Sequence, residues 1–232
     1  CADTTTQTVD VYHNPKAKMD INKTESCPPL DIVAQNQSTG EDNVTWYFDD
    51  GTPTQTNPGS VAHSYDNTTS NVLNHNLRLV TTTTDGCSDS TQLRLSVYPR
   101  VTADFGFKTD SMGCHPFNAE FSNESENANY YYWDFKDGVT SNLFEPFNRF
   151  ENTTQTPKTY DVFMKATSEF NCMDSIEKPV VVYPSPNAAF AVNPSLQVFP
   201  NATVSLDNNT NTGPWDYQWD FGDGNTSTAV EP

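Results

Sequence analysis

The stretch Trp133-Asp-Phe-Lys-Asp-Gly138 decides the fold, because related copies stand at Trp46-Tyr-Phe-Asp-Asp-Gly51 and Trp219-Asp-Phe-Gly-Asp-Gly224. In each copy a Trp and a Phe are two residues apart, so in a strand both face one side while the residue between them faces the other. The Asp-Gly that follows predicts a tight turn, since Asp bonds to nearby backbone and Gly tolerates positive φ. Each copy therefore predicts a core strand that ends in a turn.

Other markers keep the same spacing of about 86 residues and reveal an internal repeat. They are Val11-Tyr12, Val97-Tyr98 and Val182-Tyr183; Cys1, Cys87 and Cys172; and Cys27-Pro-Pro29 with Cys114-His-Pro116. We expect residues 1–12 to be the last strand of a preceding repeat, 13–99 and 100–184 to be complete repeats, and 185–232 to be a partial one. The chain thus begins within a pattern, as a piece of a longer protein would. Prolines at the junctions predict semi-rigid joints and a rod.

Composition and alternation predict an all-β chain. Of the 232 residues, 24 are Asn, 30 Thr and 18 Ser, which favour turns and strands over helices. Apolar residues alternate in Phe117, Ala119, Phe121 and again in Tyr160, Val162, Met164, Ala166. Seven or so such strands in 86 residues indicate a two-sheet sandwich. The net charge of −18 argues against a nucleic-acid partner, and no apolar run is long enough to enter a membrane.

The Trp-Asp-Phe-Gly-Asp-Gly segment, with the later His63-Ser-Tyr65, resembles the PKD domain. In the second repeat Asn148-Arg-Phe150 replaces the His-x-Tyr. The resemblance implies tandem immunoglobulin-like β-sandwiches in which Trp46, Trp133 and Trp219 are core anchors and His63 makes a structural hydrogen bond. Trp215 has no core counterpart among the repeats, and we interpret it as a loop staple in preference to a sugar platform.

Tandem PKD units with this cysteine pattern are similar to repeat regions of giant Bacteroidota surface proteins, including gliding-motility adhesins exported by type 9 secretion. The resemblance implies a non-catalytic stalk or filament segment of an extracellular, cell-surface adhesin. Its partners would be neighbouring repeats and surface polysaccharide or protein ligands. The scattered histidines and the lack of a nucleophile motif also argue against an enzyme. The alternative is an accessory substrate-binding module of a secreted polysaccharide- or protein-degrading enzyme.

Calcium is the one cofactor that the sequence suggests. Asp oxygens in turns suit this hard cation, and the candidate ligands are Asp49, Asp50, Asp137 and Asp223. The competing interpretation, turn-forming aspartates with no metal, is favoured.

Two glycosylation patterns compete with structural explanations. Asp followed by Ser or Thr is similar to the O-glycosylation signal of secreted Bacteroidota proteins, and the acceptors would be Thr4, Ser90, Ser111 and Ser175. Three of these share one repeat position, so a structural turn explains them equally well. Asn-x-Ser/Thr sequons include Asn22, Asn67, Asn152, Asn201 and Asn225, many of which an Asn- and Thr-rich chain contains by chance.

The cysteines have two possible pairings in the immunoglobulin-like fold. Pairing within repeats would join Cys27 to Cys87 and Cys114 to Cys172. In this fold, however, the second strand begins at one pole of the sandwich and the turn before the last strand lies at the other. A seven-residue strand separates the poles by about 20 Å or more, whereas the Cα atoms of a disulfide are at most about 7 Å apart. We therefore favour Cys27–Cys172 between successive repeats, with Cys1, Cys87 and Cys114 pairing to neighbouring repeats.

Overall fold

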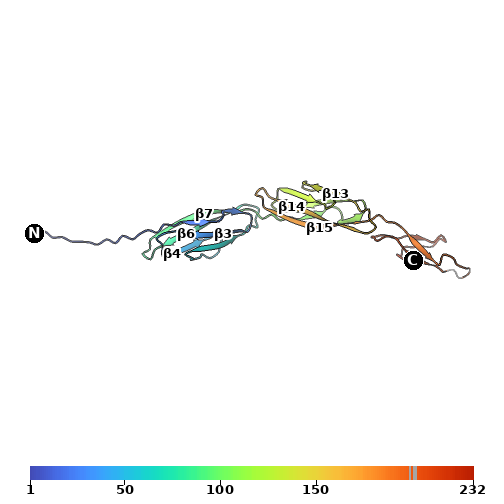
Figure 1. The fold of residues 1–232 in the computed structure, drawn as a ribbon, viewed down its shortest axis with the longest axis horizontal. Coiled ribbons are helices and arrows are strands. Elements are labelled where there is room, and N and C mark those ends of the chain that lie inside the picture. The colour runs from blue at the N-terminus through green and yellow to red at the C-terminus, as the bar shows by residue number, and fades with distance from the viewer. Residues whose placement is uncertain (199, 201–202) are drawn as a thin grey trace. The chain divides into compact units, whose positions relative to one another are not determined.

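The computed structural model describes every residue of the chain except 199, 201 and 202. The chain divides into two compact units, the first of residues 1–101 with 168–172 and the second of residues 102–167 with 173–232 (Figure 1). Across the described residues, no helix has the length and apolar character needed to cross a bilayer.

The first unit is a β-sandwich of two sheets. Its strands are β1 (Met19–Ile21), β2 (Glu25–Ser26), β3 (Leu30–Asn36), β4 (Asn43–Tyr47), β5 (Ser60–Tyr65), β6 (Leu73–Thr82) and β7 (Ser88–Val97). One sheet has the order β1-β3-β5 and the other β2-β7-β6-β4. The pairings are antiparallel except that β2 runs parallel to β7. This division of strands between two sheets is that of an immunoglobulin-like sandwich, as the sequence predicted.

Alternate residues of the strands fill the core of the first unit. Trp46 and Phe48 of the repeated motif are buried, and so are Leu77 and Leu79 of β6. The Trp46 indole Nε1–H donates to the carbonyl of Asn57, 3.0 Å away. The ring therefore fills the core while its one polar group is satisfied by the loop that follows β4.

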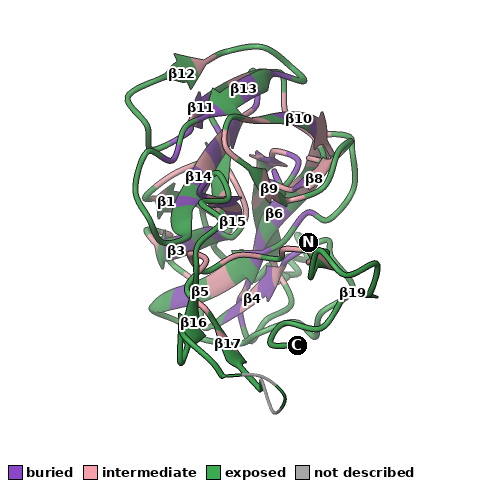
Figure 2. Cartoon of the chain, turned by 90° about the vertical axis from the view of Figure 1, so that its right-hand side faces the viewer, coloured by how far each residue is buried: buried purple, intermediate pink, exposed green. Residues whose placement is uncertain are grey.

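The second unit repeats this architecture. Its strands are β8 (Phe105–Phe107), β9 (Met112–Cys114), β10 (Phe117–Asn123), β11 (Tyr130–Asp134), β12 (Thr140–Ser141), β13 (Phe147–Phe150), β14 (Lys158–Thr167) and β15 (Met173–Tyr183). The sheet orders are β13-β10-β8 and β12-β11-β14-β15-β9, and β9 runs parallel to β15. The alternating faces predicted for residues 117–121 and 160–166 are confirmed, because β10 and β14 turn those side chains inward. Figure 2 shows the buried stretches along strands and the exposed ones mainly along loops.

Residues 185–232 form two small sheets, β16 (Phe190–Asn193) with β17 (Ser205–Asn208), and β18 (Trp219–Asp220) with β19 (Thr226–Ser227). Phe190 is 59% exposed, although its repeat counterpart Phe105 is fully buried. The described part of this segment contains no counterpart of β14 and β15, the strands that supply the covering core residues in the second repeat.

Residues 1–12 form no strand and are exposed. A strand needs a partner for its backbone hydrogen bonds, and no strand of the first unit pairs with this segment. The last strand of a preceding repeat would find its partners within that repeat, so the assignment of residues 1–12 to such a strand stays a prediction.

Candidate functional site

The repeated motif forms a turn whose fourth and sixth residues have positive φ. In the third copy both are glycines, Gly222 and Gly224, with φ of 77° and 93°. Asp49 and Lys136 occupy the fourth position of the other copies, each with φ of 61°. A side chain in this conformation costs of order 1–3 kcal/mol, so the turn is held by the surrounding fold.

In the first two repeats the fifth residue of the motif is an aspartate that accepts a hydrogen bond from a strand after the turn, β5 or β13. In the first repeat Asp50 Oδ2 lies 2.6 Å from Nε2 of His63. In the second, Asp137 Oδ2 accepts from the Asn148 side-chain amide at 2.7 Å. Asn148 thus replaces the histidine as a donor, which explains how the second repeat keeps the turn without a His-x-Tyr.

His63 lies among aromatic rings. Its ring stacks on Phe48 with centroids 4.0 Å apart and meets Tyr65 edge-on at 4.7 Å. The Tyr65 hydroxyl donates to the Phe48 carbonyl at 3.0 Å, and burial raises the pKa of Tyr65. Partial burial also acts to raise the pKa of Asp50, but hydrogen bonds from Thr52 and His63 outweigh it and hold that pKa below its usual value. The cluster fastens the motif turn to β5.

The candidate calcium ligands lie in three different repeats, and each is engaged by hydrogen bonds of its own repeat. Asp49 Oδ2 accepts from the backbone N–H of Asn76 at 2.9 Å, whereas the neighbouring Asp50 bonds to His63. The two carboxylate oxygens of Asp223 accept from Asn225 at 2.9 and 3.0 Å. Across the described residues, no three His, Cys, Asp or Glu side chains are grouped so that they could hold a metal ion. Calcium prefers six to eight oxygen ligands, and this arrangement does not fit that requirement.

Two hairpin turns of the same geometry carry Cys87 and Cys172. In Thr83–Cys87 and in Ser168–Cys172, the first residue's N–H donates to the cysteine carbonyl, at 2.9 and 2.8 Å. Its hydroxyl accepts from the cysteine N–H, at 3.1 and 3.2 Å. The residue before the cysteine, Gly86 or Asn171, has positive φ. The repeat therefore presents a cysteine at the same point of the turn each time.

Cys172 is joined to Cys27 by a disulfide, with 5.4 Å between the Cα atoms. The turn Ser168–Cys172 connects β14 to β15 of the second repeat, yet it belongs to the first unit by its contacts. Within this unit Phe170 also stacks on Tyr98, with ring centroids 4.4 Å apart and planes 6° from parallel. The pair in the structure is the one favoured from the sequence. Cys1, Cys87 and Cys114 are unpaired among the described residues, and their pairing to neighbouring repeats stays a prediction.

Two of the Asp-Ser/Thr sequences have a structural explanation for their aspartates. Asp89 Oδ2 accepts from the backbone N–H of Ala17 at 2.8 Å, and Asp174 Oδ2 accepts from that of Ala103 at 2.9 Å. Each aspartate thus ties the start of a repeat to its last strand. The neighbouring hydroxyl residues are exposed or half-buried: Thr4, Ser90, Ser111 and Ser175.

Two sequons are structural motifs that sequence reasoning missed. Asn67 and Asn152 are 1% and 2% exposed. The Asn67 amide donates to the carbonyls of Asn71 and Val97, both at 2.8 Å, and its Oδ1 accepts from Thr69. Asn152 makes the same set of bonds. The 85-residue spacing of these two Asn-Thr-Thr segments was the available signal. Asn22 and Asn225 are exposed, and Asn201 lies outside the described residues.

Two of the three tryptophans expected in the core are buried. Trp46 and Trp133 are fully buried, whereas Trp219 is only half-buried, because the described part of residues 185–232 lacks counterparts of β14 and β15 to cover it. The Trp215 indole donates to the Asn211 carbonyl at 2.6 Å and packs over Gly213. Trp215 therefore closes its own loop.

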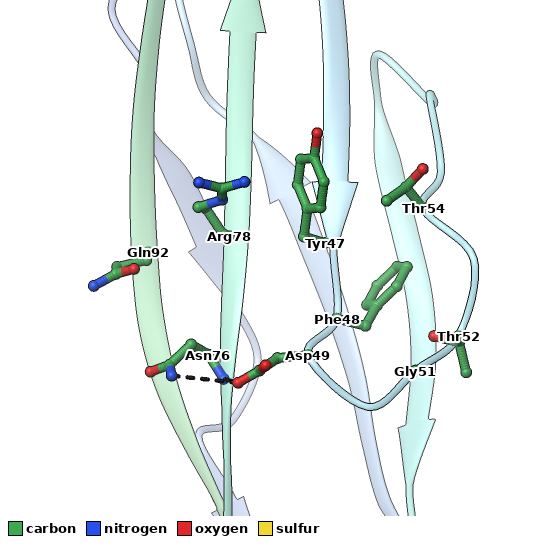
Figure 3. Close-up of a pocket in the computed structure, with 9 residues that line it drawn as sticks. All are labelled: Tyr47, Phe48, Asp49, Gly51, Thr52, Thr54, Asn76, Arg78 and Gln92. Carbon is green, nitrogen blue, oxygen red and sulfur yellow. Dashed lines mark hydrogen bonds between the residues drawn. The ribbon is translucent and has the colours of Figure 1, made fainter.

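An open groove of about 440 Å³ lies over the outer face of β4, β6 and β7 in the first repeat. Figure 3 shows Asp49 bonded to Asn76 at one end and Arg78 beside Tyr47 at the other. The Arg78 guanidinium lies 4.5 Å from the Tyr47 ring centroid. One face of the Tyr47 ring is thus covered by the protein's own cation.

A second groove, of about 550 Å³, lies in the second repeat and is lined by Asn129, Tyr130, Tyr131, Asn142 and Phe144. Tyr130 and Phe144 are 64% and 56% exposed. The sequence alternation marked Trp215 alone as an aromatic outside the core pattern, so these two rings were missed.

No family model matches the chain, and no curated protein matches it. Among solved structures, the Clostridium thermocellum CbhA fibronectin(III)-like modules are 10% identical, with 72% of this chain and 94% of that chain covered at a TM-score of 0.34. A 1.5-MDa bacterial ice-binding adhesin is 11% identical, with 78% and 69% covered at 0.32. Carbohydrate-binding modules of the β-sandwich superfamily are 12% identical, with 74% and 85% covered at 0.33. These similarities are weak, and the immunoglobulin-like fold is assigned from the strand order described above.

Proposed function

We propose that the chain is a non-catalytic stalk or filament segment of a large extracellular adhesin, built from PKD-like repeats, and that it projects distal binding regions from the cell surface. The observation that carries the proposal is the Cys27–Cys172 disulfide, which joins one sequence repeat covalently to the next. Disulfides persist in oxidising surroundings, which supports a location outside the cell. The sequence resemblance points further, to the type 9 secreted, gliding-motility adhesins of Bacteroidota.

The strand pairing of each repeat also suits a mechanical role. In both repeats a short strand near the start runs parallel to the last strand: β2 beside β7, and β9 beside β15. When the disulfide is reduced and the two ends of a repeat carry the tension, the pull acts on these strands in opposite directions along their length. Their hydrogen bonds are then loaded together in shear, which resists opening better than separating them one at a time.

Each of the four histidines makes a hydrogen bond within the fold. His13 and His75 bond to backbone carbonyls of Gly40 and Asp49, and His115 accepts from the backbone N–H of Asn152. With His63 bonded to the motif aspartate, each of the four has a local structural partner. Histidine is the most common general base in enzymes, and the engagement of all four in structural hydrogen bonds supports the non-catalytic assignment.

Small-angle scattering of the 232-residue chain tests the stalk. A compact globule of this length has a radius of gyration of about 17 Å. We expect a clearly larger value that changes little with salt, because proline-bearing junctions and the disulfide stiffen the chain. A value near that of the globule contradicts the proposal.

A binding role is the second candidate function. The exposed aromatic groove of the second repeat favours it, as an accessory substrate-binding module of a secreted polysaccharide- or protein-degrading enzyme.

A further inference from the structure

The groove lined by Asn129, Tyr130, Tyr131, Asn142 and Phe144 combines ring faces with amide groups. Tyr130 lies at the start of β11 and Phe144 in the loop between β12 and β13. Their exposed fractions, 64% and 56%, are high for large apolar side chains that share one groove. A volume of about 550 Å³ is within the usual range for ligand sites.

The groove is held in shape by the chain itself. The Tyr131 hydroxyl donates to the Ala128 carbonyl at 3.0 Å. Its ring meets Phe144 edge-on, with centroids 5.3 Å apart and planes 76° from parallel. The backbone thus fixes Tyr131, and Tyr131 in turn positions Phe144. The exposed ring of Phe144 is therefore preorganised for a ligand.

The fold does not require these aromatics. The first repeat has Asn43 at the position of Tyr130, since both lie three residues before the motif tryptophan. In each repeat the indole N–H of the motif tryptophan donates to a backbone carbonyl. The residue that follows this carbonyl is Phe144 in the second repeat and Pro58 in the first. Both repeats form the same sandwich, so the aromatic pair in the second repeat is an addition to the scaffold.

The absence of charged residues from the lining of the groove indicates the chemistry of its ligand. None of the five lining residues is acidic or basic, although the chain carries 30 acidic and 12 basic residues. No described cation lies over Tyr130 or Phe144, in contrast to Tyr47, which Arg78 covers. Within the described part of the chain, the Asn142 amide and the Tyr130 hydroxyl have no hydrogen-bond partner. The groove thus offers bare ring faces and neutral donors and acceptors.

We propose that this groove binds a neutral polysaccharide chain. The C–H faces of a pyranose ring carry partial positive charge and pack on the electron-rich faces of Tyr130 and Phe144. The sugar hydroxyls bond to the amide of Asn142 and the hydroxyl of Tyr130. An anionic polymer would find no counter-charge in the groove and would be repelled by the net charge of −18. The site stands whether or not the chain acts as a stalk.

Affinity gel electrophoresis of the 232-residue chain tests the proposal. The native gels contain hydroxyethylcellulose, galactomannan or dextran as neutral probes, and polygalacturonate as the anionic one. We expect at least one neutral polysaccharide to retard the chain and polygalacturonate not to do so. Tyr130→Ala and Phe144→Ala should each weaken retardation about tenfold, which corresponds to about 1.4 kcal/mol and lies within the range of a single aromatic contact.

Phe147→Ala is the matched control. Phe147 is 73% exposed in the same repeat but does not line the groove, so its loss should leave retardation unchanged. Melting curves of the variants show whether each still folds. The proposal is overturned if no neutral polysaccharide retards the chain, or if Phe147→Ala weakens binding as much as Tyr130→Ala. It is equally overturned if Tyr130→Ala abolishes self-association of the chain in sedimentation while no polysaccharide binds.

Discussion

Reduction of the Cys27–Cys172 disulfide should greatly lengthen the chain under tension. The bonded cysteines are 145 residues apart in sequence. With the bond intact, force passes from residue 27 directly to residue 172, and the segment between them is a loop that tension cannot extend. At about 3.3–3.6 Å per extended residue, that loop hides about 500 Å of chain.

The expected lengths follow from the same arithmetic. Subtracting the 145 bypassed residues from 232 leaves 87 under load in the oxidised chain. Fully stretched, these span about 300 Å, compared with about 800 Å for the whole reduced chain. The difference is large compared with the increments that single-molecule force spectroscopy resolves.

The assay pulls the chain from its two ends with and without dithiothreitol. A variant in which Cys1, Cys87 and Cys114 are replaced by Ser prevents mispaired thiols and should show the same two lengths. Adding Cys27→Ser to that variant should give the long form under both conditions. Equal stretched lengths with and without the reductant would refute the bypass and the covalent link on which the stalk proposal rests.

Three further predictions concern single side chains and the metal. Asn67→Ala leaves the carbonyls of Asn71 and Val97 without a buried donor, so it should lower the free energy of unfolding of the first unit by about 3 kcal/mol in urea. Asn43 is exposed, and Asn43→Ala should change that free energy little. Equal effects of the two substitutions would contradict the structural role of Asn67. Because the pKa of Asp50 is lowered in the fold, its stabilising contribution is complete above its ordinary pKa and is lost as pH falls through the lower folded value. Melting temperatures should therefore fall more steeply below about pH 4 in the parent chain than in Asp50→Asn, and parallel curves would count against the Asp50 interactions. Since no three carboxylates are grouped for a metal ion among the described residues, chelation should leave the melting curve unchanged, and a rise on adding calcium would show that the carboxylates rearrange around the ion.

Much of the fold could be read from short-range patterns. A Trp and a Phe two residues apart, followed by Asp-Gly, specify a buried strand and its turn without reference to the rest of the chain. Trp46 and Phe48 are buried on this basis, and so are Val162 and Met164 in their alternating strand. The favoured partner of Cys27 followed from the polarity of a sandwich, a property of the fold class that needs no side-chain detail.

The tertiary structure alone decided which residues meet across long separations. Asn152 is a sequon in the sequence, but its amide is buried because it reaches the carbonyl of Val182, thirty residues away. Asn148 could be recognised as a substitute for histidine only once β13 lay beside the motif turn. Tyr130 and Phe144 are fourteen residues apart, and no strand or helix periodicity relates them. Their common groove exists because the β12–β13 loop folds back beside β11, and the burial of a side chain depends on such neighbours rather than on its own sequence pattern.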